Sequence, residues 1–274
     1  MMPVNQNSVG DIMPSNSGNR QNCSQCCQRG RCLPNGLEET DLGRLETVIT
    51  RRKHLRHGEH VFRSGSPFQF LYAIRTGFFK TYELQEDGKE HISGFHMAGD
   101  IIGMDAINTS HNNCHAVALE DSELCEIHFP QLEALSREIP ALQHQFHKLM
   151  SRVIIHGHGI MLLLGGMCAE ERLAAFFLNL SQRYAARGYS ATEFHLRMRR
   201  DEIGHFLGMK METVSRTLTK FQEQHLIAVH NRHIELRDLE RLRKVVNREI
   251  KWHQRSDIPG ISQTSALTTI PIHP

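Results

Sequence analysis

The sequence predicts an α+β fold in which short antiparallel strands come first, a long helix follows, and a small helical unit with a terminal hairpin comes last. Segments between residues 51 and 129 alternate apolar and polar side chains and are separated by the turn signals "RSGSP", "EDGKE" and "MAGD", a pattern typical of the strands of a roll, barrel or jelly roll. After Pro140 the apolar period becomes helical, and near residue 200 two short helices flank Gly208.

The composition indicates a soluble globular protein. The chain has 274 residues, of which 39% are hydrophobic and 23% are charged, which is an ordinary balance. We see no run of about 18 apolar residues and no apolar core in the first 20 residues, so we expect no membrane span, no secretory signal and a cytoplasmic location. The polar ends, residues 1–22 and 256–274, are expected to be disordered.

Residues 23–32 read "CSQCCQRGRC" and hold four of the seven cysteines. In a reducing compartment closely spaced thiols indicate metal binding or redox chemistry rather than structural disulfides. An odd cysteine count also fits a fully paired disulfide framework poorly. A zinc site and an iron–sulfur site therefore remain as the two main interpretations.

The helix predicted over residues 139–166 carries a heptad seam. Seven residues spaced alternately by four and three positions form it: Leu142, Phe146, Leu149, Val153, His156, Ile160 and Leu163. Such a seam packs two helices together. A core helix packed against its own domain is the other interpretation, but a seam between a β domain and a basic domain favours a symmetric dimer, because dimers read palindromic DNA.

The segment "RRDEIGHFLGMKMETVSRTLTKFQEQHLI" (residues 199–227) predicts a helix-turn-helix. It follows an amphipathic helix, "AEERLAAFFLNLSQRYAARG", that Gly188 stops, and a hairpin "LIAVHNRHIEL" follows it. Gly204 permits close helix crossing, Gly208 makes the turn, and the second helix begins near Met211.

The second of these helices presents polar side chains suited to a DNA major groove, where Arg pairs with guanine and Glu accepts from cytosine. They are Glu212, Thr213, Ser215, Arg216 and Lys220. Residues 197–255 also hold 14 Lys and Arg against 8 Asp and Glu, which favours a polyanion partner. A solvated face with an i, i+4 pair between Glu212 and Arg216 is the alternative.

These motifs resemble the cyclic AMP receptor protein superfamily, and more narrowly its fumarate and nitrate reduction regulators. The likeness spans residues 23–245 and is carried by "DEIGHFLGMKMETVSRTL", "LYAIRTGFFKTYEL", "GFHMAGDIIGMDAI" and "EERLAAFFLNLSQR". It implies a cysteine segment (23–35), a β-roll sensor domain like a cyclic-nucleotide-binding jelly roll (36–138), a dimerisation helix (139–166) and a winged helix-turn-helix (167–245).

The resemblance also implies a site. Three cysteines spaced C-x2-C-x5-C and one distant cysteine would hold a [4Fe–4S] cluster: Cys23, Cys26, Cys32 and Cys125. Loss of the cluster in oxygen would weaken a homodimer that binds TTGAT-like half-sites of double-stranded DNA through Glu212, Ser215 and Arg216. Zinc suits four thiolates equally, so a zinc-stabilised or cluster-free regulator of another signal stays open. An iron–sulfur enzyme is a remote alternative, since no catalytic constellation is visible.

Further expectations concern other ligands and partners. Residues 98–118 contain no Arg to pair with a phosphate diester, so cyclic nucleotide binding is not expected. The 84–90 turn, with Asp87, Gly88 and Lys89, resembles an RNA polymerase contact. Cys27 has no assigned role, whereas Cys114 and Cys168 are expected to be buried thiols.

Two departures from the family pattern concern the dimer and recognition helices. The stretch "IIHGHGIML" lacks the acids expected in the second half of the dimer helix. His156, if paired across the dimer, would weaken it below about pH 6.5. Lys210 stands where Ser or Thr would cap the recognition helix, and Lys210 could contact a DNA phosphate instead.

Overall fold

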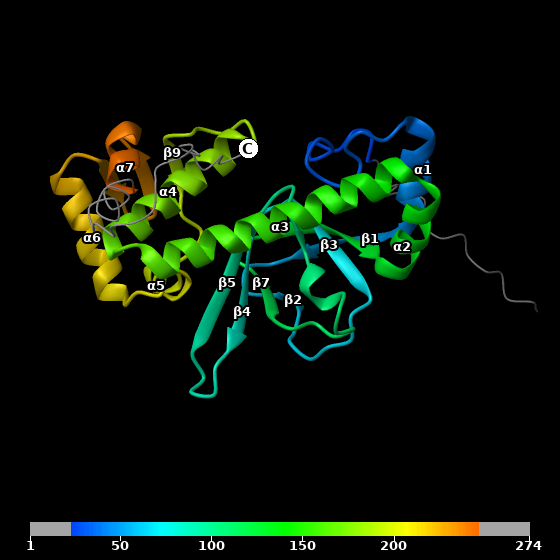
Figure 1. Cartoon of the computed structure of the whole chain (residues 1–274), viewed down its shortest axis with the longest axis horizontal. Helices are drawn as coiled ribbons and strands as arrows, with labels where there is room; N and C mark the ends of the chain where they lie inside the picture. The colour runs from blue at the N-terminus through cyan, green and yellow to red at the C-terminus, as the bar shows by residue number, and fades with distance from the viewer. Residues whose placement is uncertain (1–22, 247–274) are drawn as a thin grey trace, which may run out of the picture.

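The computed structural model describes residues 23–246, so both predicted disordered ends lie outside the described residues. A β-roll with two short helices lies beside one end of a long helix, α3, and a mixed helical unit lies at its other end (Figure 1). The roll contains β1 (Ile49–Leu55), β2 (His60–Phe62), β3 (Phe70–Thr76), β4 (Phe78–Leu84), β5 (Glu90–Met97), β6 (Ile101–Ile102), the 3-10 turn η1 (Met104–Ala106), β7 (His115–Ala118) and β8 (Ser122–His128). The flanking helices are α1 (Glu39–Val48), α2 (Phe129–Glu138) and α3 (Pro140–Gly166).

The predicted β-roll is confirmed as two four-stranded antiparallel sheets. One sheet has the strand order β1-β8-β3-β6, and the other has the order β2-β7-β4-β5. The pair β4–β5 is a long hairpin that runs from Phe78 opposite Met97 to Leu84 opposite Glu90, with a shift of register between Thr81 and Tyr82. Its tip projects away from α3 in Figure 1, which places the 84–90 turn at the edge of the molecule.

The strands alternate less than the sequence pattern implied, because both faces of each sheet are covered. In β3, the four residues 71–74 are all buried. Tyr72 and Ile74 face the interior of the roll, whereas Leu71 and Ala73 pack in a second cluster with α1, α2 and the start of α3. The outer face of the β4–β5 sheet packs against the helical unit.

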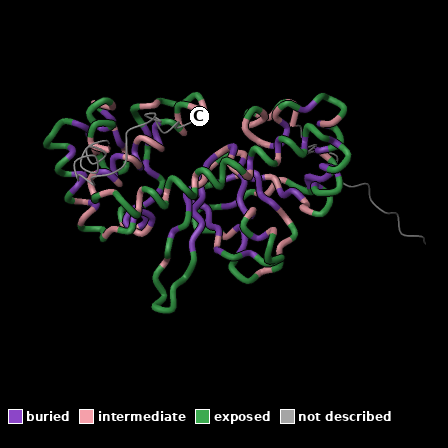
Figure 2. The backbone as a smooth tube through the Cα atoms, viewed as in Figure 1, coloured by how far each residue is buried: buried purple, intermediate pink, exposed green. Residues whose placement is uncertain are grey.

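Helix α3 changes surroundings along its length. In its first half Leu142, Gln145 and Leu149 are buried, whereas most of the later part is exposed, as the green stretch of α3 in Figure 2 shows. By length and composition alone α3 could cross a membrane, since its most apolar 18-residue window has a mean hydropathy of 1.3 and is only 6% buried. Core helices of water-soluble proteins pass the same test of length and composition, so this helix does not contradict the expectation of no membrane span.

The C-terminal unit contains the predicted helix-turn-helix and hairpin. Its elements are α4 (Ala169–Ala185), β9 (Glu193–His195), α5 (Arg200–Leu207), α6 (Met211–Glu223), β10 (Ile227–His230), β11 (His233–Leu236) and α7 (Leu239–Val246). The three strands form a sheet of order β10-β11-β9. Side chains of α4, α5 and α6 share one apolar cluster with Phe95 and Met97 of β5, so the unit is packed onto the roll.

Candidate metal centre and nucleic-acid interface

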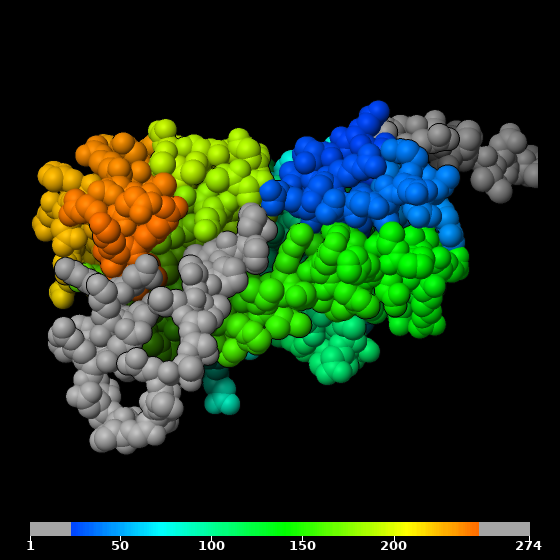
Figure 3. Space-filling view, turned by 45° about the horizontal axis from the view of Figure 1, so that its top comes forward, coloured from blue at the N-terminus to red at the C-terminus, as the bar shows by residue number. Residues whose placement is uncertain are grey.

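The cysteine segment (residues 23–35) and the two residues that follow it form a series of tight turns. The backbone N–H of Cys26 donates to the carbonyl of Cys23 (3.3 Å), and that of Cys32 donates to the carbonyl of Gln28 (3.0 Å). Buried Leu33 and Leu37 anchor its end in the cluster below sheet β1-β8-β3-β6. In Figure 3 the segment and α1, in blue, form one surface beside the green α2–α3 region.

The fourth candidate ligand comes from the sheet beneath this segment. Cys125 lies in β8, opposite Arg52 of β1 and Ala73 of β3. Its side chain lies on the same face of the sheet as Ile127, and both pack against the cysteine segment. The four thiols predicted as ligands all line one apolar cavity of about 30 Å³, so residues 93 positions apart in the sequence meet in one place.

Burial keeps three of these thiols, those of Cys23, Cys32 and Cys125, protonated when they have no metal partner. It raises the pKa of Cys23 to about 12, with Glu46 and the neighbouring thiols acting in the same direction. Burial likewise raises the pKa of Cys32 and Cys125. A cation bound among them would supply the charge that thiolates need, because metal binding releases thiol protons.

Four thiols suit a soft metal, but they lie too far apart in this structure to coordinate one ion together. Within residues 23–246, no three His, Cys, Asp or Glu side chains are arranged to hold a metal ion. A cavity of about 30 Å³ has room for about two water molecules. An iron–sulfur cluster would therefore require the cysteine segment to move outward, whereas a single zinc ion would require the thiols to close in.

The other three cysteines have separate surroundings. Cys27 is exposed and its sulfur accepts a hydrogen bond from Gln28 (3.5 Å). Cys114 is buried as expected and lies 3.6 Å from a carboxylate oxygen of Asp105. The expectation for Cys168 is wrong, because it is exposed at the N-terminus of α4, where its backbone N–H donates to the Glu171 carboxylate (2.9 Å).

The turn between α5 and α6 has the glycines that the sequence placed there. Gly208 has a φ of +62°. A Cβ on Gly204 would lie 2.6 Å from the carbonyl oxygen of Met209, so only glycine lets α5 approach the turn. The Arg199 N–H donates to the Glu202 carboxylate (2.7 Å) and caps the start of α5. Lys210 makes no side-chain cap to α6, as the sequence indicated.

Helix α6 buries Val214, Leu218 and Phe221 and turns its predicted DNA-facing side chains outward. Lys210, Glu212, Arg216 and Lys220 are exposed, and Thr213 and Ser215 are half-buried. Two of these side chains already have partners within the chain. Lys220 is ion-paired to Glu170 of α4, and the Ser215 hydroxyl accepts a hydrogen bond from Arg200 (3.4 Å).

The sequence reasoning missed two residues at this surface. Met211 begins α6 and is 48% exposed, and an apolar side chain there can contact a thymine methyl group. Arg200 is exposed beside Ser215. Their positions in the sequence could have indicated them. Met211 directly precedes Glu212, and Arg200 is the first residue of α5.

The seam residues of α3 mostly pack within the chain, the other arrangement that the pattern allowed. Leu142 and Leu149 are buried, and Phe146 packs with them. Ile160 and Leu163 pack against the C-terminal unit. His156 is half-buried and close enough to Asp100 and Arg183 for them to influence its pKa, which burial lowers. Val153 alone of the seven is strongly exposed.

A different apolar stripe of α3 faces solvent. Four side chains 57–65% exposed and repeating every seven residues form it, and we call them the open face: Ile154, Ile155, Met161 and Leu162. The sequence does not show which stripe of α3 the roll itself covers, so the assignment of the seven seam residues to a dimer interface stays a prediction.

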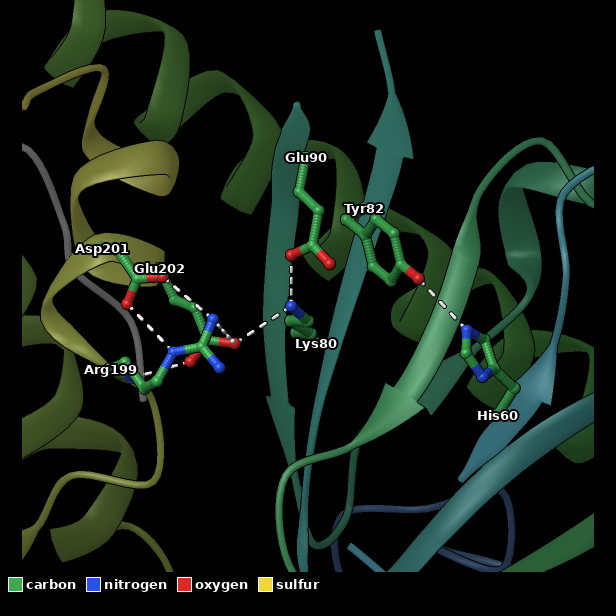
Figure 4. Close-up of polar contacts among 7 residues, drawn as sticks. All are labelled: His60, Lys80, Tyr82, Glu90, Arg199, Asp201 and Glu202. Atoms are coloured by element: carbon green, nitrogen blue, oxygen red, sulfur yellow. Dashed lines mark hydrogen bonds and ion pairs between the residues drawn. The ribbon is translucent and has the colours of Figure 1, made fainter. Parts of the chain in front are cut away.

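A buried cation joins the roll to the helix-turn-helix. Lys80 of β4 is ion-paired to Glu90 of β5 and lies 3.0 Å from Glu202 of α5. Figure 4 shows Glu202 reaching toward Lys80 from the C-terminal unit. Phe95 and Phe206 pack beside this triad with their ring centroids 5.1 Å apart. At the far end of the same hairpin, Asp87 and Lys89 pair with each other at the exposed tip.

Two domain profiles match the chain. The cyclic nucleotide-binding domain matches residues 52–138, and the Crp-like helix-turn-helix domain matches residues 171–245. The chain is 41% identical to the transcriptional regulatory protein btr of Bordetella pertussis over 83% of this chain and 94% of that protein. It is 45% identical to the fumarate nitrate reduction regulatory protein of Klebsiella oxytoca over 77% of this chain and 85% of that protein.

Among solved structures, FixK2 from Bradyrhizobium japonicum is similar, with a TM-score of 0.66 and 28% identity over 71% of this chain and 96% of that one.

Proposed function

The chain belongs to the fumarate and nitrate reduction regulators of the Crp/Fnr family and is a transcription regulator rather than an enzyme, and from this premise we propose that it senses oxygen through a [4Fe–4S] cluster held by Cys23, Cys26, Cys32 and Cys125. The observation that carries the proposal is that these four thiols, and none of the other three, line one cavity between the cysteine segment and β8.

The bound cluster would supply an oxygen-labile link between the cysteine segment and the sheet. The chain connects this link to α3. The Gln145 amide of α3 donates to the carbonyl of Cys32 (3.1 Å), and Leu142 and Leu149 share the apolar cluster that holds Leu33. A shift of the segment therefore changes the packing of the first half of α3.

A second copy of this chain is the proposed occupant of the open face of α3. The four large apolar side chains of this face are 57–65% exposed, and no charged residue lies between Arg152 and Glu170 to oppose pairing. Pairing along this face would place two α6 helices about one DNA turn apart, as a palindromic site with TTGAT-like half-sites requires. Glu212, Ser215 and Arg216 would contact base edges, and Lys210, Thr213 and Lys220 would lie beside them.

Cyclic nucleotide is not the proposed signal. Aromatic side chains of Phe62, Tyr72 and Phe79 fill the interior of the roll, and residues 98–118 supply no Arg for a phosphate. RNA polymerase is the proposed partner of the exposed tip formed by Asp87, Gly88 and Lys89. The cytoplasm is the proposed location.

A structural zinc ion is the second candidate, favoured by the small size of the cavity. The deciding experiment is an absorption spectrum with metal analysis of protein purified without oxygen. A broad visible band that air abolishes supports the cluster, and a colourless protein with one zinc per chain supports zinc.

Variants then assign the ligands. Cys125→Ala should lose the bound iron, and Cys27→Ala, which removes an exposed neighbour outside the cavity, should keep it. Cys125→Ala protein that retained its iron and its oxygen response would refute the assignment.

A further inference from the structure

The turn at residues 97–100, which joins β5 to β6, touches the cysteine segment on one side and the C-terminal unit on the other. The N–H of Gly99 donates to the carbonyl of Ile74 (2.8 Å), and the N–H of Ile74 donates to the carbonyl of Asp100 (2.9 Å). Ile74 and Arg75 of β3 line the four-cysteine cavity. The backbone of the turn is therefore fixed to a strand that forms the wall of that cavity.

Direct contact with the cysteine segment occurs at Gly99. Its φ is +90°, and a Cβ there would lie 3.0 Å from Oε1 of Gln28 and 3.1 Å from Cβ of Arg31. Gln28 and Arg31 lie between Cys26 and Cys32, two of the proposed ligands. A movement of the segment consequently changes the space directly above the turn.

The other side of the turn holds the last residues of α4 and its continuation. The Asp100 carboxylate lies 2.6 Å from Nη2 of Arg183 and 2.7 Å from Nη2 of Arg187. Nε of Arg187 donates to the carbonyl of Ala98 (2.5 Å). Burial opposes ionisation of Asp100, but the two guanidinium groups outweigh it and hold its pKa below the ordinary value.

Charge also reaches across the turn from the cysteine segment. The pKa of Arg187 is lowered, chiefly by burial, and Arg183 and Arg31 add to the effect. Arg187 is thus held by Asp100 and repelled by a residue of the cysteine segment. Because α4 shares its apolar cluster with α5 and α6, a change at Arg187 shifts the unit that carries the recognition helix.

We propose that Asp100 is a positioning residue that couples the cysteine segment to the DNA-binding unit, through the 97–100 turn and its ion pairs with Arg183 and Arg187. The inference rests on the proposed function, since a metal-dependent position of the segment is what the turn transmits. It acts within one subunit, separately from any change in pairing of α3.

The test compares full-length protein loaded with its cluster and the same protein stripped of iron, both without oxygen. Hydrogen–deuterium exchange is measured over α4, and DNA affinity is measured by fluorescence anisotropy where sedimentation shows dimers in both states. The unsubstituted protein should show cluster-dependent protection of α4 and a gain in DNA affinity in the range of allosteric couplings, about 5- to 150-fold. Asp100→Asn should keep the visible absorption band, show the same α4 exchange in both states, and reduce the gain in affinity to within about twofold of unity.

A matched control uses another ion pair between the two units. Glu120 of the turn before β8 pairs with Arg197 at 2.8 Å, and within residues 23–246 it makes no hydrogen bond or ion pair with the cysteine segment. Glu120→Gln should change DNA affinity equally in both states and preserve the cluster-dependent gain.

Each outcome decides between the hypotheses. An Asp100→Asn protein with the full gain and the full α4 protection overturns the coupling. If Asp100→Asn does not fold, the double variant Gln28→Ala, Arg31→Ala removes the contact from the other side, and an undiminished gain in that variant also overturns it. Unsubstituted protein that binds no iron refutes the proposed function itself, and the inference with it. Iron-loaded unsubstituted protein with no α4 response refutes the coupling alone.

Discussion

Replacing Lys80 by Met should destabilise the fold by leaving an acid buried without its main partner. The Lys80 and Glu202 side chains are only 7% and 5% exposed, with their charged atoms 3.0 Å apart. Methionine keeps the length and apolar stem of lysine and removes only its charge. Glu202 would retain the backbone N–H of Arg199 at 2.7 Å and the Arg199 guanidinium at 3.9 Å.

Removing one member of a buried ion pair costs about 3–5 kcal/mol of unfolding free energy. The residual contacts to Arg199 place the expected loss near the lower end, about 3 kcal/mol. The effect depends on pH. Burial lowers the pKa of Lys80, but its bonds to Glu90 and Glu202 outweigh this and raise it above 10.5. The stabilisation is therefore present in full below pH 10.5 and is lost as the pH rises through the folded-state pKa.

Urea denaturation followed by circular dichroism measures this loss at pH 7 and pH 11. Lys89→Met is the control, because Lys89 pairs with Asp87 at the exposed hairpin tip and should show no measurable loss. Adding Glu202→Gln to Lys80→Met should recover most of the stability, since removing both charges avoids the buried unpaired acid. A loss below about 1 kcal/mol for Lys80→Met, or no recovery in the double variant, would refute the reasoning.

Three further predictions concern other positions. Burial lowers the pKa of His96 from 6.5 to about 4. The folded protein therefore resists protonation of His96, and its free energy of unfolding should fall as the pH drops from 6.5 toward 4, by at most about 3 kcal/mol. His96→Gln should flatten this part of a pH titration of unfolding, and an unchanged slope would contradict the prediction. Gly77→Ala should lower the melting temperature far more than Gly58→Ala. The angle φ is positive at both sites, but only at Gly77 would a Cβ clash, 1.9 Å from the Ser122 hydroxyl and 2.9 Å from the Cα of Ser122. Equal losses of melting temperature would count against the clash. Ile154→Glu should raise the dimer dissociation constant in sedimentation velocity at least about tenfold, by burying an unpaired charge. Arg152→Gln, which changes a charge on the same helix without burying a new one, should leave it unchanged, and an unaffected dimer in Ile154→Glu would rule out the open face.

His156 was expected to weaken the dimer when it is protonated. Its position in the structure gives a different expectation. Its side chain is half-buried, and Arg183 and Asp100 of the same chain influence its pKa, which burial lowers. His156→Leu should therefore alter the packing of α3 on the roll and leave the pH response of dimer dissociation unchanged. Sedimentation at pH 5.5 and pH 8 tests this.

Local rules in the sequence were enough for the helix-turn-helix. Gly204 and Gly208 are needed because of backbone geometry within ten residues, and the apolar period of Val214, Leu218 and Phe221 fixes which face of α6 points outward. The start of α6 at Met211 follows the same signals of period and turn. The roll was also visible as strands and turns, although its strand order was not, since antiparallel pairing across long connections leaves little trace in the chain.

Long-range placement was decided only by the tertiary structure. The spacing of Cys23, Cys26 and Cys32 indicates a shared site, but only the folding of β8 beneath the cysteine segment brings Cys125 to the same cavity. The apolar residues of α3 predict a helix with more than one apolar stripe. The sequence does not show which surface packs against each stripe. The roll and the DNA-binding unit cover one stripe and leave Ile154 and Met161 open. Periodicity records which residues avoid water, whereas the partner that shields each of them depends on contacts between segments that lie far apart in the chain.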